Sequence, residues 1–130
     1  MRAEFDTYVT ADTALVTTAE TVVATLTGVA TNRPGQTLNF TGSVTLVAGT
    51  STTAFTFRVR ADSLTGTVIG EAPVDAIEVA VGSVETHTID VTDTAPGEFS
   101  GRTYVLTVQQ TGAAANGNVS QAALHGVVKP

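Results

Sequence analysis

The sequence predicts an all-β protein: an antiparallel β-sandwich of the jelly-roll type with about eight strands. Three observations support this class. Threonine, valine, alanine and glycine make up more than half of the 130 residues, which favours strands over helices. Apolar and polar side chains alternate over long stretches, as they do on a strand with one buried face. Turn signals recur every 8–14 residues, and no long stretch has a helical period.

The N-terminal half contains three predicted strands. Residues 22–26 alternate, and Pro34-Gly35 then supplies the central pair of a type II turn. Residues 38–47 and 55–61 are the two clearest alternating runs, and the turn-forming stretch 49–52 separates them. The sequence therefore predicts that these two strands form a hairpin.

The C-terminal half continues the pattern. A short strand is predicted at residues 67–70, and a second hairpin joins residues 77–81 to 87–91 through Gly82-Ser83, where glycine suits a type II′ turn. Two further strands follow, at residues 104–108 and 119–128. The apolar faces of the best strands predict a core that contains Leu38, Phe40, Leu46, Phe55, Phe57, Val59, Tyr104 and Leu106.

Composition and charge exclude several classes of protein. The chain has no cysteine, a formal net charge of −6 and a single lysine, Lys129. It therefore has neither thiolate chemistry nor the basic patch that a nucleic-acid backbone requires. No apolar run approaches the roughly twenty residues of a membrane span, and residues 1–6 do not resemble a secretory signal. We expect no nucleic acid and no membrane among the partners.

No motif in the sequence indicates catalysis or a cofactor. His87 and His125 lack the spacing of a zinc site, so we interpret both as structural. The acids Asp90, Asp93 and Glu98 lack the dense spacing of a calcium loop. The prediction is therefore a non-enzyme, with no catalytic, cofactor-binding or metal-binding residue. Arg58 and Arg60 project together from one strand face, where they either pair with acids or are solvated.

The first 13 residues predict a separate arm, followed by a β domain over residues 14–130. The arm lacks clean alternation but contains Phe5, Tyr8 and Val9, and aromatic residues of this kind often anchor interfaces. We interpret it as a docking arm; the alternative is an edge strand of the protein's own sandwich. Strand faces that should be exposed to solvent carry valines and alanines, and apolar residues on such faces favour self-association. Val105, Ala123 and Val127 are the predicted interface residues of a homotrimer.

The order of segments resembles small trimeric jelly rolls of the tumour necrosis factor type and related domains on tailed-phage virions. The similar segments are residues 19–28, Arg33-Pro34-Gly35-Gln36, the two long strands over residues 38–61, residues 103–108 and residues 124–128. This resemblance implies a capsid decoration or head-fibre protein, located on the virion, whose partners are its own copies and the major capsid protein or another virion protein. The alternative is a carbohydrate- or surface-binding β-sandwich module of a bacterial exterior protein.

Overall fold

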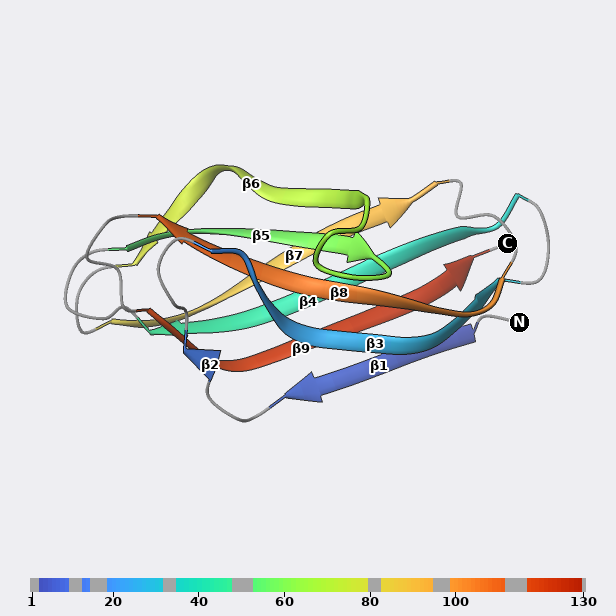
Figure 1. The fold of residues 1–130 in the computed structure, drawn as a ribbon, viewed down its shortest axis with the longest axis horizontal. Coiled ribbons are helices and arrows are strands. Elements are labelled where there is room, and N and C mark those ends of the chain that lie inside the picture. The colour runs from blue at the N-terminus through green and yellow to red at the C-terminus, as the bar shows by residue number, and fades with distance from the viewer. Residues whose placement is uncertain are drawn as a thin grey trace.

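The computed structural model describes residues 3–9, 13–14, 19–31, 35–47, 53–79, 83–94, 99–111 and 117–129. These residues form eight strands of seven residues or more and one two-residue strand (Figure 1). The strands are β1 (Ala3–Val9), β2 (Thr13–Ala14), β3 (Thr21–Thr31), β4 (Thr37–Val47), β5 (Thr53–Ala61), β6 (Val68–Val79), β7 (Val84–Asp93), β8 (Phe99–Thr111) and β9 (Asn118–Lys129).

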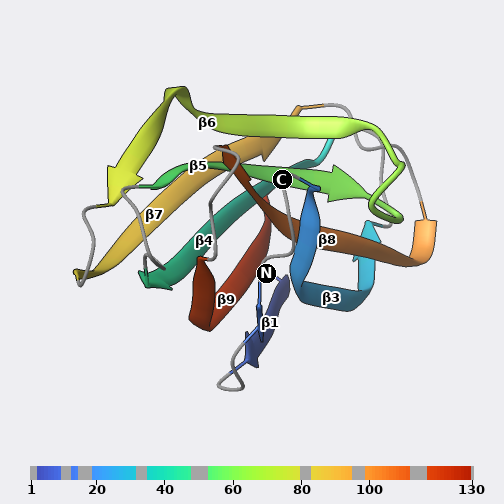
Figure 2. The ribbon, with the colours of Figure 1, turned by 60° about the vertical axis from the view of Figure 1, so that its left-hand side comes forward.

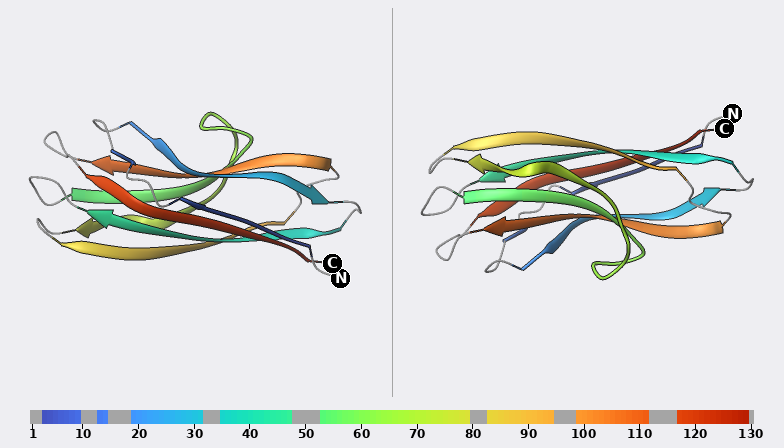
Figure 3. Two further views of the ribbon diagram at one scale, coloured as in Figure 1. Left: turned by 90° about the horizontal axis from the view of Figure 1, so that it is seen from below. Right: turned by 90° about the horizontal axis from the view of Figure 1, so that it is seen from above.

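The strands form two antiparallel sheets packed as a sandwich, seen edge-on in Figure 3. Sheet A has the order β1-β9-β4-β7, with β2 also paired to β9, and sheet B has the order β3-β8-β5-β6. Among the long strands, the first therefore pairs with the last, the second with the second last, and so on inward to β5 and β6. This nested pairing is the jelly roll, so the predicted fold class is confirmed.

The core lies between the sheets and contains every residue predicted for it. All eight are completely buried, and the rings of Phe40 on sheet A and Tyr104 on sheet B have their centroids 4.5 Å apart. Because strand side chains alternate, the residues between them point outward and form the two outer faces of the sandwich.

Both predicted hairpins are wrong. β4 belongs to sheet A and β5 to sheet B, and the same holds for β7 and β6. β4 pairs instead with β7 and β9, while β5 pairs with β6 and β8. Alternation shows that one face of a strand is buried but not in which sheet the strand lies, so a connection that crosses between sheets resembles a hairpin turn.

The first strand is also not an unpaired arm. β1 pairs with β9 from Ala3 opposite Val128 to Val9 opposite Ala122, and Phe5 packs against the core. The prediction that residues 1–13 lack a strand partner in the chain is therefore wrong for residues 3–9 and for Thr13, which pairs with Val119 of β9. The alternative, an edge strand of the protein's own sandwich, describes them.

On one side of the sandwich, the edge strands β6 and β7 approach each other closely at a glycine. A Cβ atom on Gly70 of β6 would lie 2.3 Å from the Cγ1 atom of Val91 on β7, so only glycine allows the two edge strands this approach. Figure 2 shows β6 lying over β7 at this side of the molecule. The edge strands of the two sheets are therefore in close contact at this point.

Candidate functional site

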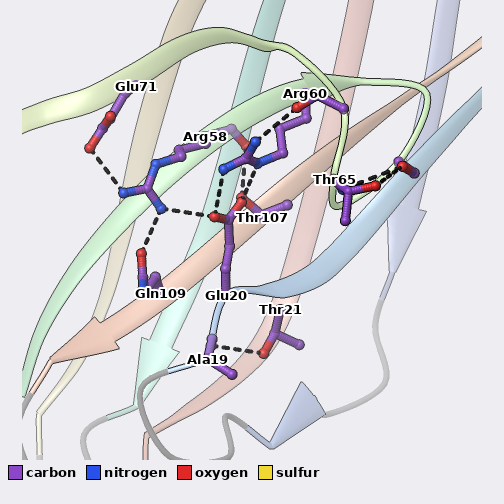
Figure 4. A network of polar contacts seen from close by, with 11 residues as sticks. Ala19, Glu20, Thr21, Arg58, Arg60, Thr65, Glu71, Thr107 and Gln109 are labelled. Atoms are coloured by element: carbon purple, nitrogen blue, oxygen red, sulfur yellow. Dashed lines mark hydrogen bonds and ion pairs between the residues drawn. The ribbon is translucent and has the colours of Figure 1, made fainter.

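The outer face of sheet B carries a network of six polar side chains (Figure 4): Glu20, Arg58, Arg60, Glu71, Thr107 and Gln109. Glu20, immediately before β3, accepts hydrogen bonds at Oε2 from Arg60 Nε and Thr107 Oγ1, both at 2.6 Å. Its Oε1 atom accepts from Arg58 Nη1 at 3.1 Å and Arg60 Nη2 at 2.9 Å. We call these six residues the polar network.

The network extends across all four strands of sheet B. Arg58 on β5 also donates to Gln109 on β8 at 2.7 Å and to Glu71 on β6 at 3.2 Å. Arg60 donates further to the carbonyl oxygen of Gly66 at 2.8 Å, which fixes the loop after β5. Every charge in the network therefore has a partner within the chain, and the alternative in which Arg58 and Arg60 pair with acids is the correct one.

The charge state of Glu20 is set by these partners. Burial by itself raises the pKa of Glu20, because the side chain is only 14% exposed. Hydrogen bonds from Arg60 and Thr107, together with the charges of Arg60 and Arg58, outweigh burial and hold the pKa below its usual value. Glu20 is thus a carboxylate at neutral pH, held by two arginines.

The outer face of sheet A has the opposite character. Its central strand, β4, turns short polar side chains outward, and the register aligns these with short side chains of β7 and β9. Ser43 lies between Ala123 and Thr88, and the next row is Gln121, Thr45 and Thr86. We call these six residues the uncharged patch. Thr45 and Thr86 share a hydrogen bond of 2.9 Å between their hydroxyl groups.

Exposed apolar side chains lie at both ends of the uncharged patch. Tyr8 on β1 is opposite Ala123 and 62% exposed, and Val84 on β7, one row beyond Thr86, is 64% exposed. Charged groups occupy the other half of this face: His125 pairs with Asp6, and Asp90 accepts a hydrogen bond from Asn39. The face is therefore divided into an uncharged half and a charged half.

The predicted interface and arm residues fall in different places. Ala123 and Val127 are half-buried on the outer face of sheet A, but Val105 is 4% exposed within the single chain and offers almost no surface to a partner. Of the arm residues, Phe5 faces the core, Tyr8 is exposed, and the side chain of Val9 lies outside the described residues.

The remaining candidate residues do not converge on one site. His87 faces inward, stacks on Phe57 and pairs with Glu85 at 3.1 Å, whereas His125 lies on the outer face. Asp93 accepts a hydrogen bond from Tyr104, while Asp90 points outward, and Glu98 lies outside the described residues. Within the described part of the chain no group of acids, histidines or cysteines could hold a metal ion. No helix there is long and apolar enough to cross a membrane.

Sequence reasoning missed Glu20, the centre of the polar network. It is 38 residues from Arg58, 40 from Arg60 and 87 from Thr107. The two outward arginines were the only signal, because they required acids near them; the strand order that brings Glu20 there is not visible locally.

No protein-family model matches this sequence, and no curated protein matches it either. Among solved structures, the chain is similar to VP2 of infectious bursal disease virus. A VP2 subviral particle gives a TM-score of 0.59 at 12% identity, covering 98% of this chain and 32% of VP2. A D431N mutant of VP2 in T=1 particles gives 0.60 at 11%, covering 97% and 31%. The chain thus spans about one third of VP2, and the similarity shows the fold alone.

Two other kinds of protein give weaker similarity. A Bacillus endospore appendage pilus has a TM-score of 0.42 at 18% identity, covering 97% of this chain and 86% of that one. A family 6 carbohydrate-binding module of a laminarinase from Zobellia galactanivorans has a TM-score of 0.39 at 11% identity, covering 95% and 98%. Neither score is high enough to support an argument about this chain.

Proposed function

We propose that this protein is a non-enzymatic structural protein of a virion, which decorates or reinforces the capsid of a tailed bacteriophage as a homotrimer. One observation carries the proposal: the uncharged patch on the outer face of sheet A consists of short side chains, whereas the outer face of sheet B is covered by the polar network. A face of this kind suits packing against protein. The VP2 structures support the proposal, because they are structures of T=1 particles and of a subviral particle whose chains contain this fold.

The partners under this proposal are copies of the chain and the major capsid protein or another virion protein. Ala123 and Val127 lie on the outer face of sheet A, so they remain candidates for the contact between copies. Nucleic acid and membranes are not proposed as partners. The charge of −6 with one lysine makes phosphate groups unfavourable neighbours.

The alternative, a carbohydrate-binding module, lacks a specific observation in its favour. Flat sugar binding usually relies on exposed aromatic rings. In the described ranges, Tyr8 is the only aromatic side chain among the exposed large hydrophobic residues.

The test uses virions purified from a culture in which the gene for this protein is present. Immunogold labelling with an antibody against the recombinant protein should place gold on the particle surface, and light scattering of the recombinant protein should give the mass of three copies. Virions without label, together with retention of the monomeric protein on a polysaccharide column, would replace this proposal by the carbohydrate-binding alternative.

A further inference from the structure

β1 is attached to the sandwich less firmly than the strand beside it. The structure describes its side chains from Glu4 to Tyr8, and none of these is completely buried. β9, in contrast, pairs with β4 along its whole length and buries four hydrophobic side chains: Val119, Ala122, Leu124 and Val128. Figure 2 shows β1 at the margin of the molecule, next to β9. A terminal strand with so few buried contacts can separate from its neighbour while the core stays intact.

The edge of β9 that β1 covers is matched to the sequence of β1. The two strands pair over seven residues, from Ala3 opposite Val128 to Val9 opposite Ala122, without a register shift. β1 contains two acids and no basic residue, whereas β9 contains the single lysine of the chain, one of its two histidines and no acid. In a protein with a net charge of −6, β9 is therefore a favourable partner for an acidic strand.

β2 determines where the chain can separate from β9. Thr13 and Ala14 pair with the first two residues of β9, beyond the part that β1 covers. Residues 10–12 alone join β1 to β2, so β1 can leave its own β9 while β2 stays paired. Three residues extend over about 10 Å. After such a separation, only the β9 strand of an adjoining copy is within reach of β1.

The pairing of β1 with β9 also brings together two sets of residues that the sequence assigned to different contacts. Ala123 and Val127 were expected at the interface between copies, and both lie on the part of β9 that β1 covers. Phe5, Tyr8 and Val9 were expected in a docking arm, and all three lie on β1. One contact, in which β1 of one copy lies on β9 of another, accounts for both sets.

From these observations we infer that copies of this chain associate by strand exchange: β1 of each copy pairs with β9 of the next, in the register found within one chain. The inference rests on the proposed function, because it names the contact of the homotrimer. The exchanged contacts are identical to those within one chain, so exchange costs no pairing energy. The contact joins unlike surfaces head to tail, and three copies can close it into a ring.

Two cysteine pairs distinguish exchange from pairing within one chain, because the natural sequence has no cysteine. Tyr8→Cys with Ala123→Cys places thiols on opposite residues of β1 and β9. The matched control, Ser43→Cys with Ala123→Cys, does the same for β4 and β9. Opposite Cβ atoms lie about 5 Å apart, which is close enough for a disulfide to form with a small adjustment.

The readout is the size of the oxidised protein in non-reducing, denaturing electrophoresis. The β1–β9 variant should run as three linked chains, because each disulfide joins one copy to the next. The β4–β9 control should run as a single chain, because both strands belong to the same copy. A second pair, Glu4→Cys with Val127→Cys, repeats the measurement near the other end of the ladder. Titration of free thiols shows whether each pair has reacted.

The outcomes separate the inference from the proposed function. If light scattering gives a trimer but both β1–β9 pairs form disulfides within single chains, or stay reduced while the control reacts, exchange is overturned and the trimer stands. A wild type that is monomeric at every concentration contradicts the homotrimer and the exchange together. Linked products longer than three chains support exchange and contradict the trimer. Linked trimers that are absent from virions but retained on polysaccharide support exchange and contradict the virion function.

Discussion

The outer faces of sheet A and sheet B are built on similar strands but are completed by different side chains. On sheet B, two arginines lie back across the strands and meet Glu20 and Glu71, so the face satisfies its own charges and covers Thr107 completely. In the uncharged patch of sheet A, the serine, threonine and alanine side chains are too short to cover the strands. Side-chain length and charge, rather than backbone topology, decide which face is complete and which is open to a partner.

Among the substitutions considered, one in the core between the two sheets should have the largest effect on stability. Phe57 is completely buried on β5, so Phe57→Ala should lower the free energy of unfolding by about 3–5 kcal/mol, as large-to-small core substitutions do. Urea melts measure it, with Thr56→Ala on the outward side of the same strand as control. A loss below about 1 kcal/mol would mean that the inner and outer sides of β5 have been assigned wrongly.

Removing the central carboxylate tests whether the polar network holds sheet B together. Glu20→Gln keeps the shape of the side chain but leaves Arg58 and Arg60 without their shared charge partner, which should lower the free energy of unfolding by about 2 kcal/mol. The control is Glu4→Gln, an exposed acid on the outer face of sheet A. Equal effects of the two substitutions in thermal melts would remove the distinction between the faces.

Acid should weaken the same network. Against the opposing effect of burial, hydrogen bonds and the charges of Arg60 and Arg58 lower the pKa of Glu20 in the folded protein below the ordinary glutamate value of 4.5. Its contribution to stability is therefore fully present above pH 4.5 and is lost as the pH falls through the lower, folded value. The stability advantage of the wild type over Glu20→Gln, measured by urea melts between pH 7 and pH 3, should shrink below about pH 4.5. An advantage that stays constant down to pH 3 contradicts the role of the carboxylate.

The smallest effect is expected on the outer face of sheet A. Thr45→Val removes the hydroxyl pair with Thr86, and it should change the free energy of unfolding by less than about 1 kcal/mol, because such cross-strand pairs are weak. A double-mutant cycle with Thr86→Val isolates the pair. A coupling of about 2 kcal/mol or more would show that the hydroxyl groups stabilise the protomer. Both outer faces would then be stabilised by contacts between their own side chains.

The sequence predicted the features that depend on neighbouring residues. Alternation placed Phe57 inward and Arg58 outward, because successive side chains on a strand point to opposite faces. It also separated the fully buried aromatic residues from the outward threonines. The fold class followed from the same pattern, since many short strands with alternating faces are typical of a sandwich.

Features that depend on the order of the strands in the sheets could not be predicted from the sequence. The two hairpins were wrong because nothing local distinguishes a turn within one sheet from a connection between sheets. β1 was interpreted as an arm because its partner, β9, is near the other end of the chain; Asp6 and His125 are 119 residues apart. Val105 was assigned to an interface because its outward direction was correct but the side chains that cover it were unknown.

The nested pairing of the strands has a consequence for synthesis. β9 lies between β1 and β4 and supplies a hydrogen-bonding edge to both, yet it is synthesised after the other strands of the sandwich. Until residues 118–129 emerge, β1 has no sheet to join and β4 has β7 on one side only. Folding of sheet A must therefore wait for β9, and pairing over such long separations is slow. Translation that stops before residue 117 would release a chain whose first strand has no partner.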